Sequence, residues 1–210
     1  MDTRGNKRIV RFIPNALTLG RLFLTGIFLA MILYASQTDK DKLSGFLLTA
    51  FILFVVTGVT DIVDGKIARM FNVTSKFGRM TDPLADKFLV CGAFICFAIA
   101  GQPHLGNLPL APMTMDILRW STALIIISRE IFVTVLRHLA EARGINFAAT
   151  ISGKIKMFLQ SFGIGTIMIK WAYVSREWGD WFTVVALSLM VIFTIISGVR
   201  AVQRPIKQQD

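Results

Sequence analysis

The chain has 210 residues, of which 54% are hydrophobic and 17% are charged, and its mean hydropathy is +0.61. Soluble domains carry more charge and less apolar surface, so this composition excludes an ordinary water-soluble protein and indicates an integral membrane protein. The net charge is +10, but the basic residues are scattered around apolar runs. This distribution argues against a nucleic-acid partner and is typical of contact with anionic lipid headgroups.

Six apolar runs approach the length of ~20 residues that crosses a bilayer as a helix. In chain order, their approximate limits are Ala16–Ala35, Ser44–Thr60, Pro83–Gly101, Ile117–Leu139, Ile151–Val174 and Trp181–Val199. We therefore expect an all-α, polytopic membrane protein with six transmembrane helices. No segment is long enough to form a separate soluble core, so residues 1–210 are expected to form a single domain.

A basic juxtamembrane segment, residues 1–14, precedes the first run. Its apolar residues Ile9, Val10 and Phe12 would rest on the acyl chains if the segment formed an N-terminal interfacial helix. A solvated basic tail is the alternative, because the same segment carries several Lys and Arg residues.

The positive charges are divided unequally between the two sides of the expected membrane. Of the 23 Lys and Arg residues, 18 lie on one side: in the N-terminal segment, in the connections after the second and fourth runs, in the ends of the runs next to these parts, or in the C-terminal tail. The others are Lys40, Lys42, Arg119, Lys170 and Arg176. By the positive-inside rule, the basic side and both termini are cytoplasmic. We thus expect the chain in the cell (inner) membrane, with its basic side facing the cytoplasm.

Two aspartates lie where the second apolar run ends. Asp61, Asp64 and Ala68 follow helical spacing and share one face, with Gly65 beside them. Two carboxylates next to residues without side-chain bulk indicate a charged groove that a ligand can approach closely. A single acid at the end of a span is more often solvated or ion-paired, but grouped acids in membrane helices are functional candidates by default.

A second pair of aspartates lies at the start of the third run. Asp82 and Asp86 are one helical turn apart, and Pro83 fits a first helical turn with Asp82 close to its cap. Consecutive helices with a short connection are antiparallel neighbours, so the two pairs are expected to converge. Facing carboxylates need a counter-charge, which arginines, protons or metal ions can supply. Oxygen ligands suit Mg²⁺ or Mn²⁺, and two such ions are typical partners of phosphate groups.

Cationic residues from the fourth and fifth runs gather on the same side. Arg129 is surrounded by apolar sequence and needs a partner or water. Glu130 is adjacent to it, but neighbours on a helix point apart, so Arg129 is expected to face a polar cavity instead. Arg137, Lys154 and Lys156 lie near the same cytoplasmic side. The alternative role of the two lysines is to anchor the fifth helix to the membrane interface. Such a cationic group favours an anionic ligand.

The aspartate-rich stretch has the pattern Asp61-x2-Asp64-Gly65-x2-Ala68-Arg69-x8-Gly78-x3-Asp82-x3-Asp86. It resembles the signature of the CDP-alcohol phosphotransferase family at every fixed position. That resemblance implies a six-span transferase, expected as a homodimer, which moves the phosphatidyl group of a CDP-linked lipid to an alcohol and releases CMP. It also implies two Mg²⁺ or Mn²⁺ ions held by Asp61, Asp64, Asp82 and Asp86, with Asp86 as the general base. The implied CDP-binding residues are Asp61, Gly65, Ala68, Arg69 and Gly78. Asn15 and Thr18, polar residues where the first run begins, are expected at the same site, and a cap of the first helical turn is the alternative role for them.

Two further stretches, PNALTLGR and the segment from Ser128 to Gln160, look like the phosphatidylglycerophosphate synthase branch of that family. This implies CDP-diacylglycerol as donor and glycerol 3-phosphate as acceptor in phospholipid biosynthesis. The acceptor phosphate would contact Arg129, Arg137, Lys154 and Lys156. An inositol phosphate is the alternative acceptor, ahead of phosphatidylglycerol and serine. A membrane cation transporter is the alternative from another class, which the placement of the acids at one mouth disfavours.

Overall fold

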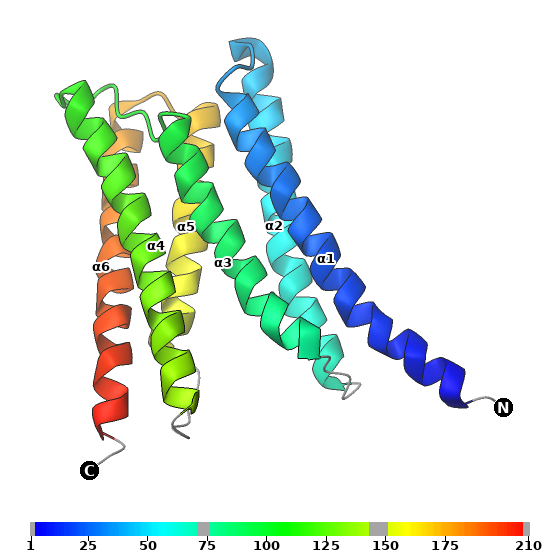
Figure 1. The fold of residues 1–210 in the computed structure, drawn as a ribbon. Coiled ribbons are helices and arrows are strands. Elements are labelled where there is room, and N and C mark those ends of the chain that lie inside the picture. The colour runs from blue at the N-terminus through cyan, green and yellow to red at the C-terminus, as the bar shows by residue number, and fades with distance from the viewer. Residues whose placement is uncertain (1–2, 71–75, 143–150, 208–210) are drawn as a thin grey trace. The chain divides into compact units, whose positions relative to one another are not determined.

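The structure, a computed structural model, describes residues 3–70, 76–142 and 151–207, with side chains for residues 19–60, 85–140, 142, 153 and 155–203. These residues form six helices and no strand, so the all-α prediction is confirmed. The helices are α1 (Thr3–Ala35), α2 (Lys40–Met70), α3 (Lys76–Ile99), α4 (Pro112–Ala142), α5 (Ile151–Tyr173) and α6 (Glu177–Lys207) (Figure 1). Each predicted apolar run corresponds to one of them in chain order.

The start of α3 differs from the sequence-based prediction. Helix α3 begins at Lys76, so the expected cap at Asp82 with Pro83 in the first turn is wrong. A proline inside a helix removes one backbone hydrogen bond and strains the preceding turn, at a cost of about 3 kcal/mol. The prediction weighed this cost but neglected the residues before Pro83, which continue the helix toward its N-terminus. Helix α2, in contrast, extends to Met70, past the apolar run, as its sequence pattern predicts.

Two of the helices in the described part of the chain are long and apolar enough to cross a membrane. The qualifying segments are Lys40–Thr60 and Glu177–Gln203, and a shorter apolar segment covers Leu19–Ala35. Large apolar side chains such as Phe23 and Phe158 are 70% and 69% exposed. Lipid chains can cover such side chains at no cost, whereas contact with water is unfavourable. The six-span topology and the direction of the termini stay predictions.

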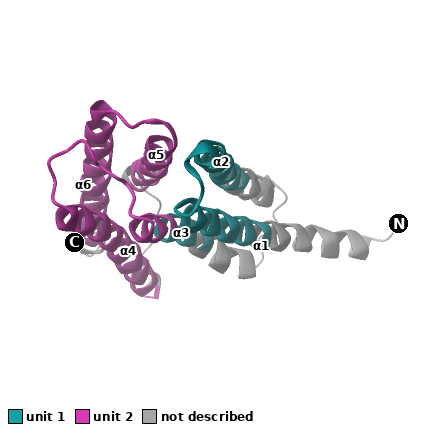
Figure 2. Ribbon diagram, turned by 90° about the horizontal axis from the view of Figure 1, so that it is seen from above, with its two compact units in different colours: residues 1–92 teal, residues 93–210 magenta. Residues whose placement is uncertain are grey.

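The chain divides into two compact units, and the division falls within α3 (Figure 2). Unit 1, Met1–Gly92, contains α1, α2 and the first part of α3. Helix α1 packs along α2, where the rings of Phe28 and Phe54 lie 5.4 Å apart in a buried core. A Cβ atom on Gly92 would lie 2.6 Å from Leu29 Cδ1, so α3 approaches α1 at a distance that favours glycine.

Unit 2, Ala93–Asp210, contains the rest of α3 together with α4, α5 and α6. Helix α6 packs against both α4 and α5. Its buried residues Met190, Thr194 and Ser197 recur at helical spacing and form one inward stripe. A Cβ atom on Gly163 of α5 would lie 2.9 Å from Met190 Sδ, so α5 and α6 are in close contact at this level.

A group of polar contacts, here called the Asp180 cluster, ties the loop after α3 to the turn between α5 and α6. Asp180 is 0% exposed, and its Oδ1 lies 2.7 Å from Lys170 Nζ. Its Oδ2 accepts hydrogen bonds from the backbone N–H and the Nδ2 of Asn107, at 2.9 and 3.0 Å. Asn107 Nδ2 also donates to the carbonyl of Ser175, and Lys170 Nζ donates to the carbonyl of His104. Each of these donors therefore has an acceptor within the protein.

Candidate functional site

The predicted metal ligands lie on two helices of unit 1. Asp61 and Asp64 are within α2, and Asp82 and Asp86 are within α3. Both pairs are therefore helical, and the spacing that puts each pair on one helix face holds. Four carboxylates are oxygen donors of the kind that Mg²⁺ and Mn²⁺ prefer, so the donor set fits these ions. The convergence of the two pairs stays a prediction, since three of the four side chains lie outside the described residues.

Asp86 is the member of this set whose side chain is described. It is half-buried and follows Ala85, which is fully buried. Leu89 continues the buried face of α3, while Phe88 is 57% exposed, so Asp86 lies at the boundary of that face. A carboxylate in this position keeps part of its hydration. Among the described side chains, no group of three His, Cys, Asp or Glu is placed to hold a metal ion.

The predicted CDP-binding residues belong to the same unit. Gly65, Ala68 and Arg69 lie within α2, Gly78 lies within α3, and Asn15 and Thr18 lie within α1. Their side-chain surroundings are outside the described residues, so their roles stay predictions. What the structure adds is that all of them, like the aspartates, are carried by helices of the unit that precedes Ala93.

Two of the four predicted acceptor-binding residues meet in unit 2 at one carboxylate. Lys156 Nζ forms an ion pair with Glu130 Oε1. Arg129 Nη1 lies 3.2 Å from the same oxygen. Glu130 and Lys156 are each 6% exposed, and 13% of the Arg129 side chain is exposed. The structure therefore brings Arg129 and Lys156 together at one carboxylate, while their role in acceptor binding stays a prediction.

The contact between Arg129 and Glu130 corrects the sequence analysis. Adjacent residues on a helix do point apart at Cβ, but both side chains are long and flexible enough to meet at their ends. The expectation that Arg129 turns away from Glu130 was therefore wrong. In a buried position the electrostatic attraction outweighs the lost side-chain freedom.

Two further residues complete the group, which we call the Glu130 cluster: Arg129, Glu130, Lys156, Gln160 and Ser197. Gln160 Nε2 lies 3.5 Å from Glu130 Oε1, and Arg129 Nη2 donates to Ser197 Oγ at 2.6 Å. The cluster joins α4, α5 and α6. The sequence analysis missed Gln160 and Ser197, although Gln160 follows Lys156 by one helical turn and thus shares its face.

The other two predicted acceptor ligands are less closely connected to this group. Arg137 follows Glu130 by two helical turns, which puts it along the same side of α4, and it is exposed. Lys154 lies within α5, and its side chain is outside the described residues. The participation of both residues in acceptor binding stays a prediction.

Comparison with known proteins decides the family. The family model for CDP-alcohol phosphatidyltransferase matches residues 11–196. The chain belongs to this family. It is 34% identical to the CDP-diacylglycerol–glycerol-3-phosphate 3-phosphatidyltransferase of Bacillus subtilis over 194 residues, 89% of this chain and 91% of the relative. It is 31% identical to a probable phosphatidylglycerophosphate synthase of Mycobacterium tuberculosis over 206 residues, 97% of this chain and 85% of the relative.

A third relative has the same name as the Bacillus protein and a lower identity to this chain. The CDP-diacylglycerol–glycerol-3-phosphate 3-phosphatidyltransferase of Rickettsia prowazekii is 27% identical over 191 residues, 91% of this chain and 93% of the relative. The resemblance inferred from the aspartate pattern is confirmed, and this CDP-alcohol phosphatidyltransferase is an enzyme.

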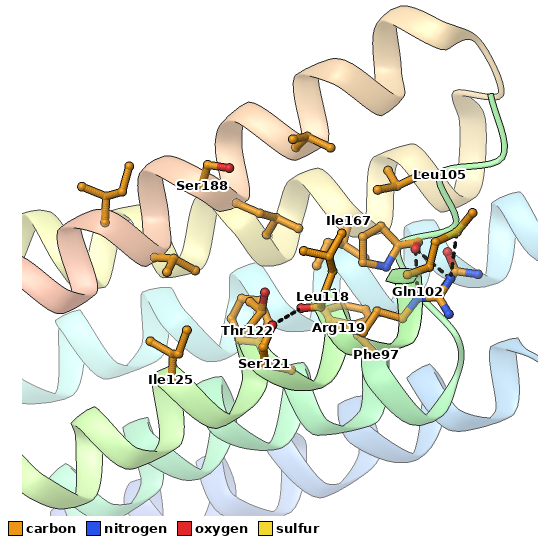
Figure 3. A pocket seen from close by; sticks show the side chains of 17 residues that line it. Phe97, Gln102, Leu105, Leu118, Arg119, Ser121, Thr122, Ile125, Ile167 and Ser188 are labelled. Atoms are coloured by element: carbon orange, nitrogen blue, oxygen red, sulfur yellow. Dashed lines mark hydrogen bonds between the residues drawn. The ribbon is translucent and has the colours of Figure 1, made fainter. Parts of the chain in front are cut away.

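Unit 2 of this phosphatidyltransferase also contains a cavity of about 380 Å³ (Figure 3). Its lining is mostly apolar and includes Phe97, Leu118 and Ile167. Arg119 lies at its edge, where Nε and Nη2 each donate to the carbonyl of Pro103 at 3.1 Å. Arg129, Arg137 and Lys156, the predicted acceptor-binding residues of unit 2 with described side chains, are not among the residues that line this cavity. It is therefore distinct from the Glu130 cluster.

Proposed function

We propose that this phosphatidyltransferase transfers the phosphatidyl group of CDP-diacylglycerol to glycerol 3-phosphate, giving phosphatidylglycerophosphate and CMP. The observation that carries the choice of acceptor is the meeting of Arg129 and Lys156 at one buried carboxylate. Two cationic side chains kept together inside a helix bundle suit an acceptor with its own phosphate, whereas serine would not need them. The names of the Bacillus and Rickettsia relatives specify the same acceptor for those proteins.

The reaction follows from the roles assigned to the aspartates. Asp86 accepts the proton of the glycerol 1-hydroxyl, and the resulting oxygen attacks the phosphorus that carries the diacylglycerol. The bond from this phosphorus to the CMP oxygen breaks, and CMP leaves with that electron pair. Asp61, Asp64, Asp82 and Asp86 would hold two Mg²⁺ or Mn²⁺ ions, which when bound neutralise the pyrophosphate charge. A half-buried Asp86 supports this assignment, because a base must be reachable by the alcohol.

The remaining residues bind the two substrates. Gly65, Ala68 and Gly78 leave room for the nucleotide against the helices, and Arg69 pairs with its phosphates. Asp61, Asn15 and Thr18 complete the CDP site. Arg129 and Lys156, together with Arg137 and Lys154, orient the acceptor phosphate so that the hydroxyl reaches the phosphorus.

The setting we propose is the cell (inner) membrane, with lipids around six spans and both termini and the reaction on the cytoplasmic side. Two helices able to cross a bilayer and many exposed apolar side chains support membrane insertion. The excess of Lys and Arg on one side supports the orientation. Residues 1–210 would act as one catalytic domain in a homodimer, and the basic segment 1–14 would lie along the interface.

A CMP-release assay with a panel of alcohols tests the proposal. Purified protein in lipid vesicles receives CDP-diacylglycerol, Mg²⁺ and one acceptor: glycerol 3-phosphate, inositol 1-phosphate, serine or phosphatidylglycerol. We expect CMP and phosphatidylglycerophosphate with glycerol 3-phosphate and at most weak release with the other alcohols. A clear preference for another acceptor, or metal flux into the vesicles without any CMP release, would contradict the proposal.

A further inference from the structure

Glu130 is a buried acid that the proposed reaction does not use, although it contacts two residues that the reaction needs. It is 6% exposed within α4, between the buried residues Ile126 and Val133 of the same helix face. We propose that Glu130 is a positioning residue, which holds Arg129 and Lys156 in the geometry that binds an anionic acceptor. This inference rests on the proposed function and deepens it, since it concerns the site of the acceptor phosphate.

The contacts of Glu130 converge on a single oxygen. Oε1 takes the ion pair from Lys156, lies 3.2 Å from Arg129 Nη1 and lies 3.5 Å from Gln160 Nε2. These partners come from α4 and α5, so one atom determines how close the two cationic groups can be. Without this negative charge, two cations in a buried position would repel each other and separate.

The guanidinium group of Arg129 makes two contacts within the protein and has a further N–H group that can donate to a ligand. Nη1 is engaged by Glu130, and Nη2 by Ser197 Oγ of α6 at 2.6 Å. These two contacts orient the plane of the guanidinium group. The Nε atom is buried, and in the described part of the chain it has no hydrogen-bond partner. A guanidinium has several N–H donors in a planar fork that matches phosphate oxygens.

Glu130 therefore acts through its neighbours and not on the substrate. A carboxylate repels a phosphate group, so Glu130 itself cannot bind the acceptor. Its effect is to hold the guanidinium group of Arg129 and the ammonium group of Lys156 next to each other before the substrate binds. Preorganisation of this kind lowers the entropic cost of binding, and its loss appears in the affinity for the acceptor.

Steady-state kinetics of Glu130→Gln tests the inference, because this variant keeps the shape of the side chain and removes the charge. We expect KM for glycerol 3-phosphate to rise about tenfold or more, while KM for CDP-diacylglycerol changes less than about twofold. Glu130→Asp keeps the charge on a shorter side chain and should recover part of the loss. Inorganic phosphate, used as a competitive inhibitor of the acceptor, should bind the Glu130→Gln variant correspondingly more weakly.

Asp180→Asn is the matched control, since Asp180 is also a buried acid that pairs with a lysine of α5. It should lower the melting temperature without changing KM for glycerol 3-phosphate. If Glu130→Gln lowers the melting temperature in the same way and leaves this KM unchanged, Glu130 is merely structural and the inference is overturned. If Glu130→Gln cannot be purified, Glu130→Asp decides: an unaltered KM for the acceptor overturns the inference as well.

The wild-type panel separates this inference from the proposed function. Activity with glycerol 3-phosphate together with an unaffected KM in the Glu130 variants refutes the inference alone. Activity with an inositol phosphate instead refutes the proposed acceptor, and the same variants are then measured with that phosphate. Activity confined to an uncharged acceptor overturns both, because such a substrate needs no paired cations.

Discussion

Asp180 and Glu130, two buried acids of unit 2, each pair with a lysine but differ in the other donors that contact them. Asp180 and Glu130 are 0% and 6% exposed, and each pairs with a lysine of α5, Lys170 and Lys156 respectively. The other donors to Asp180 are neutral groups of Asn107. Glu130 has a second cation, Arg129, at the same oxygen that pairs with its lysine.

The difference lies in how the donors are used. In the Asp180 cluster, the lysine and the asparagine also donate to backbone carbonyls. These contacts attach the loop after α3 to the end of α5 and the start of α6. In the Glu130 cluster, Arg129 retains a buried Nε without a partner in the described residues. Burial of an acid therefore does not reveal its role. The role is indicated by the N–H groups around the acid, because a buried N–H group without a partner can donate a hydrogen bond to an oxygen of a bound ligand.

The largest effect on activity is expected for Asp86, which lies outside both clusters, and the effects of the cluster variants can be compared with it. Asp86→Asn removes the proposed base, so kcat should fall by about 10²–10⁴-fold. The Glu130 cluster should instead act on KM for the acceptor. Steady-state CMP release at saturating substrates measures the difference, and substrate-free melting temperatures check that the variant is folded. Normal kcat in Asp86→Asn would remove this residue as the base.

The next largest effect compares the two lysines. Lys156→Met and Lys170→Met each leave a buried carboxylate without its lysine partner, so each should destabilise the fold by about 3–5 kcal/mol. Lys156→Met should in addition reduce kcat/KM for glycerol 3-phosphate by about 100-fold, through loss of a charged contact to the phosphate. Lys170→Met should leave that ratio within about twofold of the wild type. Equal activity losses in the two variants would abolish the distinction between the clusters.

A smaller effect is expected for Asn107→Ala, which removes the side-chain hydrogen bond to Asp180 and the one to the carbonyl of Ser175. The backbone N–H remains, so one of the bonds to Asp180 can persist. We expect a loss of about 1–3 kcal/mol in unfolding free energy, because a buried carboxylate oxygen loses a donor. Thermal unfolding in detergent measures it. A change in KM for the acceptor would show that this end of unit 2 also contributes to substrate binding.

The smallest effect is expected for Ser197→Ala, which removes one hydrogen bond to Arg129 and leaves its contact with Glu130. The guanidinium plane should become less restricted, and KM for glycerol 3-phosphate should rise by about two- to fivefold with kcat preserved. Ser188→Ala is a suitable control, since Ser188 lies on the same helix and lines the separate apolar cavity. Identical kinetics in the two variants would indicate that Ser197 does not orient Arg129.

The order and helical nature of the elements could be predicted because bilayer length and apolar composition constrain them strongly. The same holds for the placement of Asp61 and Asp64 on one helix, since a helical period fixes which residues share a face. The start of α3 could not be predicted, because it depends on whether neighbouring residues offset the cost of Pro83 inside a helix.

The contacts of the candidate site were predictable only in part. The charge pattern indicated that Arg129 and Lys156 act together, but it did not indicate that Glu130 joins them. That contact depends on the ends of flexible side chains, which follow from the packing of α4 against α6 and of α5 against α6. Ser197 belongs to a helix far away in the sequence, and no local pattern identifies its partner. The same is true of Asn107 and Asp180, which are 73 residues apart.

The pairing of Lys170 with Asp180 has a consequence for the assembly of the protein in the bilayer. Both residues flank the short turn between α5 and α6, so their ion pair can form as soon as this helical hairpin exists. In the proposed topology, this turn must be carried across the membrane during biosynthesis. A charge costs much less to translocate when an opposite charge accompanies it. The hairpin can then be inserted as a partly neutralised unit.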